Sequence, residues 1–259
     1  MWFLAVLCAV VGLAIGSFLN VVIWRVPRDE SVVHPRSHCP SCGHSVRPYD
    51  DIPVVSWLVL RGRCRDCGEP ISLRYPLVEL GTAVLFAVTA WHFGFSWELP
   101  AYLYLVAIGV ALAMIDLDVH RLPNKIVLPS YVVVAALLTL ASVGTDDWAA
   151  LLRAAVGGAA LYAFYFALRL AYPRGMGFGD VKLAGLLGAY LGWLGWGQLA
   201  VGAFLGFLLG GVVGGALMAL NRADRKSKIP FGPFMILGAY VAVLAGAQIS
   251  DLYLDLFVS

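Results

Sequence analysis

Long apolar runs follow one another along almost the whole chain and constrain its fold more than any other feature. An α-helix needs about 20 mostly apolar residues to cross the hydrocarbon core of a bilayer. About eight runs approach this length, at residues 2–24, 77–96, 100–118, 125–144, 149–171, 181–195, 197–220 and 232–256. The sixth is the shortest, and its boundary with the seventh is the least sharply marked. Only 13% of the residues are charged, against about 25% in soluble domains, so the sequence predicts an all-α polytopic membrane protein.

One polar segment, residues 25–76, interrupts the apolar runs and is expected to lie outside the membrane. It divides the chain into a first transmembrane helix at 1–24, this insert, and a transmembrane core of about seven helices at 77–259. The first run has no Lys or Arg before Arg25, whereas a secretory signal has a basic start and a small-residue cleavage site. We therefore expect the first run to remain as a membrane helix. The insert is too short to bury a good core unaided, so a metal is expected to stabilise it.

Basic residues predict the orientation, because cytoplasmic loops carry an excess of Lys and Arg. If the insert is cytoplasmic, the connections near 119–124, 172–180 and 221–231 are cytoplasmic as well. These regions and the adjoining helix ends hold every Lys and Arg except Arg153. The other side carries the acidic residues Glu98, Asp146, Asp147, Asp251 and Asp255. The pattern predicts a multi-pass protein of the cytoplasmic membrane with its N-terminus outside and its insert in the cytoplasm.

Four cysteines of the insert form two Cys-x-x-Cys pairs, Cys39/Cys42 and Cys64/Cys67. Each pair continues into a glycine, in CPSCGHSV and CRDCGEPI, as expected for two knuckles that grip one ion. In a reducing compartment this pattern indicates metal binding rather than disulfides. Four thiolates form a closed tetrahedral site, so we expect a structural zinc ion.

Other residues of the insert leave alternatives open. Three histidines could replace a cysteine as ligands, although solvated loop positions explain them better: His34, His38 and His44. Five arginines are expected to stabilise the thiolates and to hold the insert near anionic lipid: Arg36, Arg47, Arg61, Arg63 and Arg65. A disulfide between the knuckles stays possible only if the insert lies outside the cell.

Two aspartates need explaining, because a carboxylate at or within a membrane span is costly and marks a functional site by default. Asp116 lies near the end of the third run and Asp180 lies at the start of the sixth, immediately before residue 181, so the predicted topology puts both at the cytoplasmic face. Two carboxylates that approach each other share a proton, and one then acts as a base on water while the other acts as an acid toward a carbonyl. This is the chemistry of aspartic proteolysis. The alternatives are that Asp118 and its neighbours are interfacial residues and that Asp180 caps its helix.

Glycines surround the second aspartate in RGMGFGDVKLAG. Gly177 and Gly179 allow strained backbone angles and a close approach to a ligand, so an extended peptide substrate could pair with this segment. Together with Lys182, they are the expected substrate-binding or supporting residues.

Six motifs in order give the chain a close resemblance to the prepilin peptidases, membrane aspartic proteases with a Gly-x-Gly-Asp signature. They are GSFLNVVIWRVP at 16–27, the four cysteines, YPLVEL at 75–80, IDLDVHRLPN at 115–124, GFGD at 177–180 and PFGPF at 230–234. The resemblance places the catalytic pair on Asp116 and Asp180, with Asp118 as the neighbour most easily mistaken for the first of them. It also implies cleavage of the basic leader of type IV prepilins or pseudopilins, after a glycine and on the cytoplasmic side.

The resemblance further implies that the new N-terminal amine is methylated with S-adenosylmethionine. Glu79 lies in a motif associated with that activity, and its alternative role is a snorkelling or helix-start carboxylate. No glycine-rich nucleotide loop of the Rossmann type is visible. The expected partners are prepilin substrates and membrane lipid but no nucleic acid, and the sequence does not specify an oligomeric state.

Two readings from other functional classes compete with the peptidase. An ion- or proton-coupled transporter could use the same aspartates to bind protons or cations, and it would have an inverted repeat and helices broken at mid-membrane. A zinc-bearing assembly scaffold would need none of the carboxylates.

Overall fold

The computed structural model describes residues 1–173, 175–220 and 229–257, and helices make up nearly all the regular structure in this part of the chain. No strand occurs in the described ranges, where the only β pairing consists of two isolated bridges. Contacts between residues divide the chain into two compact units. The first comprises Met1–Leu99 and Leu103–Ala111, and the second comprises Pro100–Tyr102 and Leu112–Ser259. The predicted all-α fold is confirmed.

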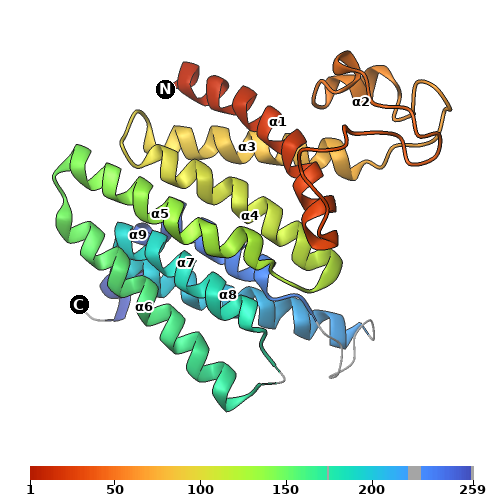
Figure 1. Cartoon of the computed structure of the whole chain (residues 1–259). Coiled ribbons are helices and arrows are strands. Elements are labelled where there is room, and N and C mark those ends of the chain that lie inside the picture. Colours follow the sequence, from red (N-terminus) through yellow and green to blue (C-terminus); the bar gives the residue numbers. More distant parts are fainter. Residues whose placement is uncertain (174, 221–228, 258–259) are drawn as a thin grey trace. The chain divides into compact units, whose positions relative to one another are not determined.

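Two long helices, α1 (Trp2–Arg25) and α3 (Arg74–Phe93), pack along each other in the first unit (Figure 1). Glycines make this contact close, since a Cβ atom on Gly12 would lie 2.8 Å from the Cα of Ala83, and one on Gly16 would lie 2.7 Å from the Cα of Glu79. Small residues let helices approach in lipid, where apolar burial contributes little to association. The insert between the two helices contains only the short elements η1 (Val26–Arg28), η2 (Pro48–Asp50) and α2 (Val55–Val59).

The second unit is built around α7 (Phe178–Leu194). This helix packs against α5 (Asn124–Thr145), α6 (Trp148–Ala171), α8 (Trp196–Ala219) and α9 (Gly232–Phe257). The closest approach joins α6 and α7, where a Cβ atom on Gly188 would lie 2.5 Å from the carbonyl oxygen of Gly157. Helix α4 (Leu99–Val119) contributes residues to both units.

Within the described residues, seven helices are long and apolar enough to cross a membrane. They correspond to all the predicted spans except the sixth, which is α7. With 17 residues, α7 is about 26 Å long, slightly less than the hydrocarbon thickness of about 30 Å. Most of its residues are buried, so protein rather than lipid surrounds it and its length need not match the bilayer. The boundary predicted at Leu194–Gly197 is confirmed, because Gly195 separates α7 from α8.

The predicted cytoplasmic connections are only partly described. Residues 221–228 of the connection 221–231, and residue 174 of the connection 172–180, lie outside the described residues.

Candidate active site and metal centre

Asp116 lies near the end of α4 and is buried, with only 4% of its surface exposed. Its Oδ2 atom accepts a hydrogen bond of 3.0 Å from the peptide N–H of Gly232. Helix α9 begins at Gly232, and the first peptide N–H groups of a helix have no partner within that helix. The start of α9 therefore holds the Asp116 carboxylate, and the positive end of the helix dipole favours its charge.

Asp180 occupies the first turn of α7 and is held in a similar way. Its Oδ2 atom accepts a hydrogen bond of 2.9 Å from the peptide N–H of Gly177, the residue that caps this helix. The capping role that the sequence left open is therefore real. It is compatible with catalysis, since a carboxylate has a second oxygen atom.

Leu122 connects the surroundings of the two aspartates. A Cβ atom on Gly179 would lie 2.9 Å from the Cβ of Leu122, and one on Gly232 would lie 3.3 Å from the Cδ2 of the same side chain. Leu122 thus packs against the start of α7 and the start of α9. Sequence reasoning did not single out this residue, although it lies in the IDLDVHRLPN segment.

The Lys182 side chain binds Asn124, and no hydrogen bond or ion pair joins it to either of the two aspartates. Its Nζ atom donates a hydrogen bond of 2.8 Å to Oδ1 of Asn124 and lies 4.7 Å from the centre of the Phe178 ring. The Tyr131 hydroxyl donates to the Lys182 carbonyl oxygen at 2.6 Å. These contacts tie the first turns of α7 to α5. By contrast, Asp118 is exposed, since two residues along a helix correspond to a rotation of about 200°.

The four insert cysteines converge in the first unit, with all their sulfur atoms within 4.8 Å of one another. The Cys39 and Cys67 sulfurs are 3.7 Å apart. Sulfur atoms around a tetrahedral zinc ion lie about 3.8 Å apart, because each Zn–S bond is about 2.3 Å long. The thiols are therefore spaced to fit zinc. The peptide N–H groups of Cys42 and Ser41 lower the pKa of Cys39 to about 6, whereas burial and the neighbouring thiols raise the pKa of Cys67 to about 12.

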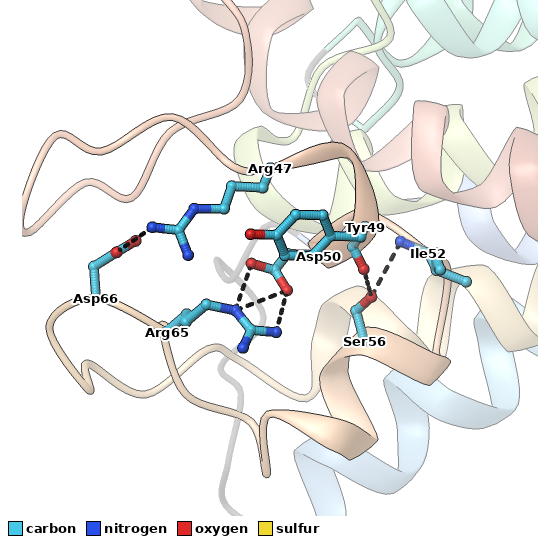
Figure 2. A network of polar contacts seen from close by, with 7 residues as sticks. All are labelled: Arg47, Tyr49, Asp50, Ile52, Ser56, Arg65 and Asp66. Carbon is cyan, nitrogen blue, oxygen red and sulfur yellow. Dashed lines mark hydrogen bonds and ion pairs between the residues drawn. The ribbon is translucent and has the colours of Figure 1, made fainter.

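Two ion pairs connect the segment before the second cysteine pair to residues between Cys64 and Cys67 (Figure 2). Arg65 donates three hydrogen bonds to the Asp50 carboxylate, the shortest of 2.6 Å, and lowers the pKa of this carboxyl. Arg47 pairs with Asp66 at 2.9 Å. Two of the five arginines expected to stabilise the thiolates are thus paired with carboxylates, which link the segment 47–50 to the second knuckle.

Comparison with known proteins adds the decisive observation. Residues 10–93 match the bacterial peptidase A24 N-terminal domain, and residues 103–218 match the type IV leader peptidase family. A prepilin leader peptidase/N-methyltransferase of Stutzerimonas stutzeri is 39% identical over 278 residues, which cover 96% of this chain and 94% of the relative. This chain belongs to the type IV leader peptidase family.

Relatives of the same printed name occur in other bacteria. The Pseudomonas aeruginosa protein is 38% identical, with 96% of this chain and 93% of the relative covered. The Aeromonas hydrophila protein is also 38% identical, with 99% and 96% covered. No solved structure was found to match the chain.

In this member of the leader peptidase family, Glu79 is buried in α3 with 8% of its surface exposed. Its Oε2 atom accepts a hydrogen bond of 2.7 Å from the peptide N–H of Val54. Neither a snorkelling nor a helix-start role describes this position. The side chain links α3 to the insert.

Proposed function

We propose that this protein is a prepilin leader peptidase and N-methyltransferase in which Asp116 and Asp180 form the catalytic pair. One observation carries the proposal. Two carboxylates from distant parts of the chain each accept a peptide N–H at the start of a helix, and both helix starts pack against the same side chain, Leu122. The printed names of relatives that match almost the full chain support the substrate class.

The chemistry follows from a proton shared by the two carboxylates. The ionised aspartate takes a proton from water as the water oxygen attacks the scissile carbonyl carbon. The protonated aspartate hydrogen-bonds to the carbonyl oxygen and then supplies a proton to the departing amine. The peptide N–H groups of Gly232 and Gly177 fix both carboxylates during this exchange. An extended substrate would pair with the segment at Gly177–Gly179 on the cytoplasmic side.

Two further components belong to the proposal. S-adenosylmethionine would supply the methyl group for the N-terminal amine that cleavage releases. A zinc ion held by the four cysteines would stabilise the cytoplasmic insert.

A transporter that uses the same aspartates is not supported. Such a protein would carry its ionisable residues near mid-membrane, whereas Asp116 lies three positions before the last residue of α4 and Asp180 lies in the first turn of α7. Membership of a peptidase family argues in the same direction.

The direct test combines the purified full-length protein, a prepilin precursor and labelled S-adenosylmethionine. Mass spectrometry is expected to detect a product cut after the glycine of the leader, with one methyl group on the new N-terminal amine. An intact precursor would contradict the peptidase assignment. A cut product without a methyl group would contradict the methyltransferase assignment alone.

Gly232→Ala is expected to slow leader cleavage strongly. The added Cβ atom would lie 2.8 Å from Oδ2 of Asp116, so the carboxylate must move, and a displacement of about 1 Å at a catalytic group costs about a hundredfold in rate. Initial cleavage rates measure the effect.

Gly211→Ala in α8 is the matched control, since a Cβ atom there would meet nothing within 4 Å. It should keep the wild-type rate. Equal rates for the two variants would show that Gly232 does not position Asp116.

A further inference from the structure

A cavity of about 310 Å³ lies in the first unit, between the end of α1 and the insert. Its volume falls within the range of small-molecule sites, about 300–1,000 Å³. Three charged residues line it, namely Arg25, Arg36 and Asp51, and valine and proline side chains form most of the remaining wall. The cavity contains no residue of the proposed peptidase pair or of the cysteine cluster.

Arg25 is the most unusual residue of this wall, because its side chain is charged and only 8% of its surface is exposed. Its Nη1 and Nη2 atoms donate hydrogen bonds of 2.8 and 2.7 Å to the carbonyl oxygens of Ser31 and Pro35. No carboxylate of the described residues lies within ion-pair distance of it. Burying a charge without a counter-ion is expensive, so this guanidinium is suited to an anionic ligand group.

Asp51 supplies the opposite charge at a fixed place on the same wall. The preceding Asp50 is clamped by Arg65, as Figure 2 shows. The following turn is closed by Ser56, whose hydroxyl accepts from the Ile52 N–H at 3.2 Å and donates to the Tyr49 carbonyl at 3.0 Å. Asp51 and Arg25 both line this cavity, and no ion pair joins them.

A cavity with this charge arrangement complements a zwitterion, and an α-amino acid group is the simplest zwitterion that also has an apolar chain. We propose that the cavity binds the amino-acid end of S-adenosylmethionine, with Arg25 facing its carboxylate and Asp51 its ammonium group. Arg36 adds a second cation for the carboxylate, and the apolar walls accommodate the methionine chain. This assignment rests on the proposed N-methyltransferase function.

The test measures binding to the full-length protein in nanodiscs by isothermal titration calorimetry. Three ligands are compared: S-adenosylmethionine, its decarboxylated analogue, and 5′-methylthioadenosine, which lacks the whole amino-acid end. S-adenosylmethionine should bind at least about tenfold more tightly than either analogue, since a hydrogen-bonded charge contributes about 1.5–3 kcal/mol. This comparison needs no variant and therefore does not depend on the folding of one.

Asp51→Asn provides the second arm, because it removes the charge and keeps the shape of the side chain. It should weaken S-adenosylmethionine about tenfold and leave 5′-methylthioadenosine unchanged. The exposed Glu30 offers a matched control, and Glu30→Gln should bind all three ligands as the wild type does. Circular dichroism and gel filtration check the fold of each variant.

The possible outcomes distinguish a failure of the proposed binding site from a failure of the proposed methyltransferase function. Equal affinity for the three ligands, or an undiminished affinity in Asp51→Asn, overturns the inference when the same preparation methylates its substrate. A preparation that cuts the leader but neither methylates nor binds S-adenosylmethionine overturns the methyltransferase function together with the inference.

Discussion

Asp116→Asn and Asp180→Asn should each abolish leader cleavage, with a loss in rate of about a thousandfold or more. Asparagine can accept the hydrogen bond that the peptide N–H donates to the native carboxylate, but it can neither take up nor release the catalytic proton. The fold should therefore survive while the chemistry stops. Initial rates on a prepilin precursor measure the loss, and thermal unfolding of each variant tests whether the structure is intact.

Asp118→Asn is the matched control for these variants. It removes the same charge from the same helix at an exposed position, and it should retain most of the activity. Complete loss in Asp118→Asn, or normal cleavage in either of the other variants, would mean that the catalytic pair is assigned to the wrong residues.

Cys64→Ser is expected to have the second large effect, on metal content and on the order of the insert. The wild type should bind about one zinc ion per chain, and the variant should lose most of it, because a closed structural site uses four protein ligands. Metal binding of this kind contributes about 10–16 kcal/mol to the folding of isolated zinc-finger peptides. Elemental analysis measures the metal, and limited proteolysis of residues 25–76 measures the loosening.

Cys8→Ser separates the loss of a ligand from the loss of any thiol. Cys8 is buried in α1 and lies outside the cysteine cluster, so zinc should be retained. Equal metal content in Cys8→Ser and Cys64→Ser would contradict a site made of the four insert cysteines.

The sequence predicts the helices well because each one is a local property of the chain. The apolar runs coincide with α1 and α3–α9 to within a few residues, since the cost of exposing peptide groups to lipid fixes where a span begins and ends. The short sixth run differs for a physical reason. Helix α7 is surrounded by other helices, and a helix that faces protein is not required to match the bilayer thickness.

The sequence could predict the hydrogen bond of Asp180 but not that of Asp116. Gly177 lies three residues before Asp180, and an acidic residue in the first turn of a helix is a recognisable capping pattern. Gly232 lies 116 residues beyond Asp116, and only the folded second unit brings them together. The position of Leu122 cannot be predicted from the sequence for the same reason, because its packing against Gly179 and Gly232 depends on tertiary structure.

The contacts of the charged residues in the insert cannot be predicted from the sequence. The sequence counts Arg25 as one of several basic residues that indicate orientation, whereas in the structure it is buried in the wall of a cavity. Arg47 and Arg65 are close to the cysteines in the sequence but pair with Asp66 and Asp50. Proximity along the chain does not determine which charges meet when the segment has few apolar residues to fix its path.

The packing of Leu122 has a consequence for how the two carboxylates keep their separation. Each carboxylate accepts a hydrogen bond from a different helix start, Asp180 from Gly177 and Asp116 from Gly232. These two glycines are far apart in the sequence. Leu122 packs against Gly232, which is one of them, and against Gly179, which lies two residues after the other, Gly177. We therefore expect the volume of the side chain at position 122 to influence the separation of the two helix starts that hold the carboxylates.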